Sequence, residues 1–144
     1  MTASSSDVDS VVALNSELYE AFESADLDRM EALWIDGEFA DGATCIHPGW
    51  APLRGRAAIL RSWAVIMANT SYIQFFLTDV DVQVTGDVAI VTCTENVLTP
   101  GPSDADAVFG GSRAVSTNVF RRTPSGWRMW VHHASPVMNP HASS

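Results

Sequence analysis

The sequence predicts a single α+β domain in which helices come first and antiparallel hairpins follow. Three observations support this class. Apolar residues recur at helical spacing in two early segments and again after Gly55, whereas from Tyr72 onward they alternate with period two. Turn residues interrupt the alternating part at Gly86-Asp87 and at 123–126. The length of 144 residues fits one domain.

Three helices are expected, each with one apolar face. The first starts near residue 8, the second begins after Asp26, whose side chain is a suitable cap, and the third begins after Gly55. In chain order, the residues of the three apolar faces are Val8, Val11, Val12, Leu18, Tyr19 and Phe22; Leu27, Met30, Leu33 and Trp34; and Ile59, Leu60, Trp63, Ile66 and Met67.

Five strands are expected. A short one at 43–47 lies between the second and third helices and ends at Pro48-Gly49. The other four follow the third helix, and a loop rich in Pro, Gly, Ser and Asp at 100–111 divides them into two pairs. Their approximate ranges are 72–84, 88–98, 113–122 and 127–135. The expected order is therefore α-α-β-α-β-β-β-β.

The strand at 72–84 changes register along its length. Its apolar side chains fall into two sets of opposite parity, Ile73, Phe75 and Leu77, then Val80, Val82 and Val84. Either a bulge near Thr78-Asp79 flips the register, or different faces are covered at the two ends. Both interpretations predict a long, bent strand in a curved sheet. Such a sheet packs helices on its concave side and can pair with another subunit on its outer side.

The two ends of the chain are expected to lie outside the fold. We expect a disordered tail at 1–7, a single domain at 8–137 and a flexible tail at 138–144. The start of the chain lacks the cationic and apolar stretches of a signal peptide, and no apolar run approaches the ~18 residues that a spanning helix needs. We therefore expect a cytoplasmic protein.

The charge balance excludes two kinds of partner. The net charge is −9, and the chain contains no lysine at all. Phosphate backbones need clustered cationic side chains, so we expect no nucleic-acid partner. The same argument disfavours an anionic membrane surface.

No metal site is expected. Cys45 and Cys93 each fall inside a predicted strand and are interpreted as small buried hydrophobes. There is no CxxC or Cys/His pattern that would indicate structural zinc. His132 and His133 are adjacent on a strand and so point in opposite directions, which prevents both from binding one metal ion.

Glu95 is the carboxylate of greatest interest. It shares one face of its predicted strand with Ala89, Val91, Cys93 and Val97. If that face points inward, desolvation disfavours the charged form, and Glu95 either finds a partner or stays partly protonated. That is the environment of a tuned general acid or base. Alternatively, Glu95 reaches solvent at the strand end, or pairs with Arg113 or Arg121 across the sheet.

His133 is the candidate partner of Glu95 on the last strand. It ends an apolar face formed by Trp127, Met129 and Val131, and His132 is expected to point the other way. A histidine there either relays a proton or hydrogen-bonds a ligand, or is a core residue with its polar atoms satisfied.

Two further polar residues are candidates. His47 ends the short strand just before Pro48, where its ring either projects over a cavity mouth or stabilises the turn. Asn118 lies among apolar residues of the strand at 113–122, where it hydrogen-bonds either a ligand or a neighbouring backbone group.

Aromatic residues are candidates for the walls of an apolar pocket. The chain has five tryptophans, which is high for its length. Trp34 and Trp63 lie on helix faces that must meet the sheet, which favours a core role for these two. We predict that a flat apolar ligand would contact members of the set Trp34, Trp50, Trp63 and Phe75.

Four stretches of the chain together carry a family resemblance. They are Tyr19-Glu20-Ala21-Phe22 with Asp26-Leu27-Asp28 and Leu33-Trp34; His47-Pro48-Gly49-Trp50 with Leu53-Arg54-Gly55 and Ile59; Gly86-Asp87-Val88-Ala89 with Val91-Thr92; and 118–122 with 126–129 and 132–135. In order and spacing, over about residues 8–137, they resemble the SnoaL-like branch of the nuclear transport factor 2-like (NTF2-like) superfamily, which includes the ketosteroid-isomerase-like proteins.

The resemblance implies a cone-shaped α+β shell that forms dimers through its sheet. Members include isomerases, dehydratases, polyketide cyclases, epoxide hydrolases and non-catalytic binding or assembly modules, so the fold alone does not choose a function. The isomerases use an aspartate base with a tyrosine and a protonated acid as oxyanion hole. Here the only tyrosines are Tyr19 and Tyr72, and Tyr19 is expected on a core helix face. The cyclases use a pocket aspartate, where this chain offers Glu95.

Two function hypotheses follow. The first is a pocket protein that isomerises, cyclises or dehydrates a small, mostly apolar molecule without a cofactor. In this hypothesis Glu95 is the acid or base, His133 or His47 is its partner, and Asn118 donates to a developing oxyanion. No GxSxG, Walker A or GxGxxG motif is present, so no hydrolase elbow, NTPase or dinucleotide enzyme is indicated. The second hypothesis is a non-catalytic binding module or dimeric assembly module.

Overall fold

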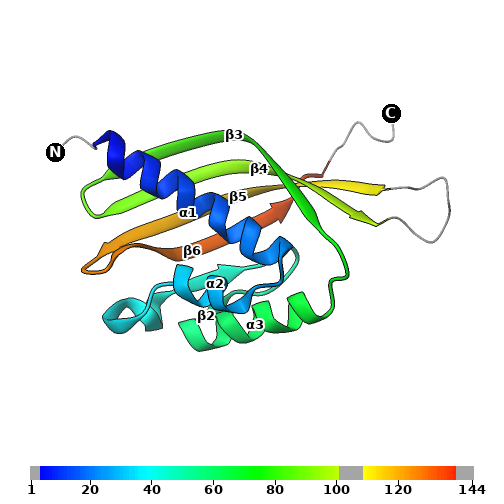
Figure 1. The fold of residues 1–144 in the computed structure, drawn as a ribbon, viewed down its shortest axis with the longest axis horizontal. Helices are drawn as coiled ribbons and strands as arrows, with labels where there is room; N and C mark the ends of the chain where they lie inside the picture. The colour runs from blue at the N-terminus through cyan, green and yellow to red at the C-terminus, as the bar shows by residue number, and fades with distance from the viewer. Residues whose placement is uncertain (1–3, 101–108, 139–144) are drawn as a thin grey trace.

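The computed structural model describes residues 4–100 and 109–138, and within them it confirms the α+β class (Figure 1). Helix α1 (Ser5–Glu23) lies across one curved sheet, α3 (Arg56–Ala68) packs beside two short strands, and α2 (Leu27–Leu33) contacts α1 and α3 (Figure 1). The elements are α1 Ser5–Glu23, α2 Leu27–Leu33, a 3₁₀ helix η1 Gly37–Gly42, β1 Thr44–Ile46, β2 Leu53–Arg54, α3 Arg56–Ala68, β3 Gln74–Thr85, β4 Val88–Pro100, β5 Phe109–Thr123 and β6 Gly126–Pro136.

The sheet has six strands in the order β2-β1-β6-β5-β4-β3. All neighbours pair antiparallel except β1 and β6, which are parallel. The expected mostly antiparallel sheet is therefore confirmed. The sequence did not predict β2 or η1. β2 has only two residues, too few to show a period, and η1 spans GEFADG, which lacks an apolar repeat.

The helix starts follow local capping chemistry. Asp26 accepts a hydrogen bond from the Arg29 backbone at 3.1 Å, as expected. Gly55 precedes α3 with a φ of 90°, which a residue without a Cβ adopts freely. Ser4 caps α1 by accepting from the Asp7 backbone at 3.1 Å. The predicted tail at 1–7 is thus wrong for residues 5–7, which form the first turn of α1.

Other predicted boundaries differ modestly. Trp34 leaves the second helix and forms a parallel bridge with Met129 of β6. The predicted loop at 100–111 is wrong at its two ends, since β4 includes Pro100 and β5 begins at Phe109. Residues 101–108 and 139–144 lie outside the described residues.

Of the two explanations considered for the change of register in β3, the structure has the bulge. Its pairing with β4 shifts between Thr78 and Asp81, and Asp79 has a positive φ of 53°. An aspartate tolerates this left-handed conformation better than most residues. The bulge moves Leu77 and Val82 onto the same face despite their opposite parity, since they pair with Glu95 and Val91 of β4.

A second bulge, not expected from the sequence, lies in β6. Val119 of β5 pairs with Val131 and Phe120 with Met129, which leaves Trp130 as the extra residue. The extra residue flips the parity of the rest of the strand. His132 is consequently buried, at 3% exposure, and His133 is exposed. The predicted inward orientation of His133 is therefore wrong, and His132 takes that place.

The core lies between the helices and the concave face of the sheet. Its fully buried members come from all layers, including Val11, Met30, Ile59, Val91, Phe120 and Met129. Cys45 and Cys93 are both buried free thiols, as the sequence predicts. In the described part of the chain, no helix is long and apolar enough to cross a membrane.

Asp7 ties the start of α1 to the β5–β6 hairpin. Arg122 donates to its two carboxylate oxygens at 2.9 and 3.0 Å, and Trp127 Nε1 donates to one of them at 3.2 Å. The Arg122 guanidinium also lies 4.4 Å from the Trp127 ring centroid. The hydrogen bonds from Arg122 and then Trp127 hold the pKa of the Asp7 carboxyl well below its usual range.

Asp7→Asn is expected to lower Tm at pH 7 and to lower it less at pH 3. Because the pKa of Asp7 is lower in the folded chain, its contribution is fully present above the unfolded pKa of about 4 and is lost as pH falls toward the folded pKa. Thermal denaturation of the wild type and Asp7→Asn from pH 2 to 7 measures the difference between their Tm values at each pH. Asp9→Asn, at an exposed site on the same helix, is the control. A difference in Tm that does not change with pH would contradict the explanation that the ion pair of Asp7 causes it.

Candidate functional site

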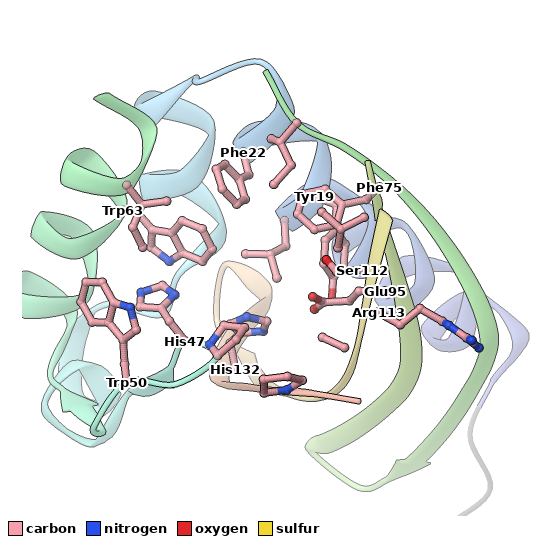
Figure 2. A pocket seen from close by; sticks show the side chains of 17 residues that line it. Tyr19, Phe22, His47, Trp50, Trp63, Phe75, Glu95, Ser112, Arg113 and His132 are labelled. Atoms are coloured by element: carbon pink, nitrogen blue, oxygen red, sulfur yellow. The ribbon is translucent and has the colours of Figure 1, made fainter. Parts of the chain in front are cut away.

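A pocket of about 430 Å³ opens between α1, α3 and the concave face of the sheet (Figure 2). This volume lies within the range of small-molecule sites, about 300–1,000 Å³. Most of its wall is apolar, and the ionisable side chains that face it are few. The lining comprises Leu18, Tyr19, Phe22, His47, Pro48, Trp50, Trp63, Ile66, Ile73, Phe75, Glu95, Val97, Ser112, Arg113, Ala114, His132 and Pro136.

Glu95 projects into this pocket from β4, and its exposure of 4% confirms the inward orientation (Figure 2). Its partner is neither of the arginines considered from the sequence, and no ion pair of Glu95 occurs within residues 4–100 and 109–138. Instead, Tyr19 donates its hydroxyl hydrogen to Oε2 at 2.7 Å. Burial raises the pKa of Glu95, while hydrogen bonds from Tyr19 and Ser116 lower it, and burial prevails.

The Tyr19 hydroxyl also forms hydrogen bonds with other buried polar groups. Its hydroxyl oxygen lies 3.0 Å from Ser116 Oγ and 3.3 Å from Asn118 Nδ2, which donates to it. Burial, then the charge of Glu95, raises the pKa of Tyr19 far above its usual value. The phenol therefore stays neutral and remains a donor to Glu95.

Asn118 joins two parts of the site without lining the pocket itself. Its Nδ2 donates to Asn15 Oδ1 at 2.7 Å, which leaves Oδ1 to face His132 Nδ1 at 2.6 Å. The prediction that Asn118 contacts a ligand directly is therefore wrong, because its side chain does not line the pocket. Asn118 is fully buried, and it orients Tyr19 and His132, which do line the pocket.

These bonds fix the tautomer of His132. Because Asn118 Oδ1 can only accept, Nδ1 carries the proton and Nε2 carries the free lone pair. Burial, followed by the nearby charges of His47 and His133, lowers the pKa of His132 to about 3. His132 is neutral at physiological pH and presents one acceptor nitrogen.

His47 is fixed in the same way. Ser62 Oγ donates to the Ile59 carbonyl at 2.6 Å, so it accepts from His47 Nε2 at 2.9 Å. Burial lowers the pKa of His47 to about 4. Its ring packs edge to face against Trp50 and Trp63, with centroid distances of 4.8 and 4.7 Å. Of the two orientations considered from the sequence, the structure has the ring lining the pocket.

Burial shifts the pKa values of the acid and of the two bases in the pocket in opposite directions. The pKa of Glu95 is raised from its ordinary value, whereas those of His47 and His132 are lowered to about 4 and about 3. Burial penalises whichever form is charged, so it moves acids and bases in opposite directions. The two imidazoles are therefore neutral hydrogen-bonding groups at physiological pH, and Glu95 is the pocket carboxyl whose affinity for a proton is increased by burial.

Residues 11–140 match the family profile described as the SnoaL-like domain. This chain belongs to the SnoaL-like family. A proposed dehydratase of the NTF2-like family from Streptomyces avermitilis is 51% identical over 93% of this chain and 98% of that one, with a TM-score of 0.83. No curated protein matches the chain.

Two further solved structures extend the likeness. A proposed calcium/calmodulin-dependent protein kinase type II association domain from Thiobacillus denitrificans is 34% identical over 88% of this SnoaL-like chain and 94% of its own, with a TM-score of 0.74. An NTF2-like superfamily protein from Salmonella enterica is 18% identical over 99% of both chains, with a TM-score of 0.80, and supports the fold alone.

The predicted aromatic contacts divide into two groups in this SnoaL-like protein. Trp50, Trp63 and Phe75 line the pocket, and Phe75 also packs on the Tyr19 ring with centroids 5.0 Å apart. Trp34 does not line the pocket and is fully buried in the core. Trp50 is the outermost of the set, with 46% exposure.

Tyr19 and His132 are the site residues that sequence reasoning missed. The helical spacing places Tyr19 on a core face, but a buried phenol also needs a partner for its hydroxyl. Asn15 lies four residues earlier on the same face of α1 and is equally buried. Two polar residues at this spacing on an apolar helix face are a signal from which a buried polar site could have been predicted.

No group of three or more histidine, cysteine, aspartate or glutamate side chains gathers within the described ranges in a way that suits a metal ion.

Proposed function

We propose that this SnoaL-like protein is a cofactor-independent acid/base enzyme that dehydrates, isomerises or cyclises a small, mostly apolar carbonyl compound. The observation that carries the proposal is the buried Glu95 carboxyl, which faces an apolar pocket while Tyr19 donates to one of its oxygens. The hydrogen bond leaves Oε1 to accept a proton from a ligand. Dehydration is favoured among the three reactions by the 51% identical relative.

In the proposed dehydration, the Glu95 carboxylate takes a proton from the carbon next to a carbonyl group. The electron pair of that C–H bond forms the new C=C bond as the β C–O bond breaks. The leaving hydroxide then takes the proton from Glu95 and departs as water, which restores the carboxylate. In an isomerisation, Glu95 instead returns the proton to a different carbon.

The remaining polar groups position these reactants. Tyr19 holds Glu95 in one orientation. His132 and His47, both neutral, accept hydrogen bonds from a ligand hydroxyl at their unprotonated nitrogens. His133 has no role in this scheme, since it is exposed on the other side of the strand.

The test is proton exchange at carbon. The protein is incubated in D₂O with a panel of β-hydroxy ketones and enolisable ketones, and the products are followed by ¹H NMR. We expect loss of water, or incorporation of deuterium next to the carbonyl, at a rate proportional to protein concentration. Ligand binding without any such reaction across the panel would contradict the enzyme proposal.

A non-catalytic assembly role is the alternative. It is supported by the 34% identical association domain and by exposed apolar side chains on the outer face of the sheet. Phe76, Ile90 and Val115 are 50%, 40% and 48% exposed, and their register places them opposite the face that carries Glu95. A homodimer through this face is compatible with either function. Light scattering after gel filtration measures it, and a monomer at all concentrations would contradict it.

A further inference from the structure

Trp63 holds a buried hydrogen-bond donor that has no partner. The residue is 3% exposed, and its indole nitrogen Nε1 forms no hydrogen bond with the described residues. Buried donors are nearly always paired, because losing water without gaining a partner costs free energy. The indole lines the pocket, and its nitrogen lies on the ring edge that faces His47 (Figure 2).

Most other donors of the pocket wall are already occupied. The Tyr19 hydroxyl donates to Glu95, the Nε2–H of His47 to Ser62, and the Nδ1–H of His132 to Asn118. What these groups offer to a ligand is therefore their acceptor atoms.

The remaining donors lie at the margin of the pocket. Ser112 and Arg113 are exposed, and the Arg113 guanidinium is directed away from the cavity (Figure 2). Trp50 is 46% exposed, so its N–H can reach water. Trp63 is thus the one free side-chain donor in the buried part of the lining that the structure describes.

We propose that the Trp63 indole N–H is the group that recognises an acceptor oxygen of the ligand, such as a ketone or ester carbonyl. The inference rests on the proposed function for the same pocket and narrows its substrate class. Trp63 stands on the α3 wall and Glu95 on the sheet wall (Figure 2). The ligand is therefore a flat apolar molecule with an acceptor oxygen at its α3 end and a proton-donating group toward Glu95.

The experiment compares two probes of similar shape, 1-indanone with a carbonyl and indane without one. Their dissociation constants are measured by equilibrium dialysis with the wild type, Trp63→Phe and Trp34→Phe. The ratio of the two constants removes the general effect of apolar burial. Trp34 is the matched control because its indole nitrogen is also buried and unpartnered but lies outside the pocket.

In Trp63→Phe, the preference for 1-indanone over indane is expected to fall by about three- to tenfold, the usual worth of one hydrogen bond. In Trp34→Phe the preference should stay within a factor of two. An unchanged preference in Trp63→Phe, an equal loss in Trp34→Phe, or no binding of either probe would overturn the inference.

A second measurement needs no variant of the pocket. In the ¹⁵N-labelled wild type, 1-indanone should move the Trp63 indole proton downfield and indane should not. A shift of equal sign and size with both probes would overturn the inference. These readouts concern binding alone, so they are independent of the exchange reaction that tests the enzyme proposal.

Discussion

Replacing Glu95 with glutamine is expected to lower kcat/KM for exchange or dehydration by about 10²- to 10⁴-fold, the usual contribution of a positioned general base. Glutamine has nearly the same shape, and its amide oxygen can still accept the hydrogen bond from Tyr19. It cannot take up a proton. The loss would therefore report the missing base rather than a damaged pocket, and it is measured by ¹H NMR in the D₂O assay.

The same variant should fold at least as well as the wild type at pH 7. Burial raises the pKa of Glu95, so the stability linked to this group is present at low pH and declines as pH rises through the folded pKa. A neutral glutamine avoids that penalty. Full activity of Glu95→Gln with an unchanged Tm would show that another group moves the proton.

Tyr19→Phe is the companion variant, because it removes the donor and keeps the base. The hydrogen bond from Tyr19 lowers the pKa of Glu95, so its loss raises that pKa further. Since the carboxylate is the active form of the base, the acidic limb of the kcat/KM profile should move to higher pH. If the acidic limb stays at the same pH in Tyr19→Phe, that limb does not reflect the ionisation of Glu95.

The inward orientation of Glu95 and the bulge of β3 could be predicted because both are visible in the alternation of apolar residues along the strands. The face of β4 is unbroken from Ala89 to Val97, and the parity of β3 reverses near Thr78. The bulge at Trp130 is not visible in the alternation of apolar residues. Trp130 and its two neighbours Met129 and Val131 are all apolar, so the sequence fits either register. An unbroken alternation therefore predicts an inward His133, whereas the bulge turns His132 inward.

The pocket itself could not be predicted from period and propensity. A side chain that lines a cavity and one that fills a core have the same pattern along the chain, as Trp63 and Trp34 illustrate. What separates them is the spacing between α3 and the sheet, which depends on residues far apart in sequence. The pairing of Tyr19 with Glu95 spans 76 positions for the same reason.

Asn118→Leu is expected to lower the free energy of unfolding by about 2 to 4 kcal/mol, because it leaves two buried groups unpaired at about 1–3 kcal/mol each. Asn118 is fully buried and is the partner of both the Asn15 carbonyl oxygen and the His132 Nδ1–H. Leucine is of similar size and offers neither group a partner. Urea denaturation of the variant and the wild type measures the loss.

The double variant Asn15→Leu/Asn118→Leu separates the network from simple packing. In the double variant both the Asn15 carbonyl oxygen and its donor on Asn118 are absent, so that oxygen is no longer left unpaired and the loss should be smaller than the sum of the two single losses. Additive losses would mean that the two amides act independently. In that case, Asn118 would not be what connects α1 to His132, and the orientation of the free His132 Nε2 toward a ligand would lose its physical basis.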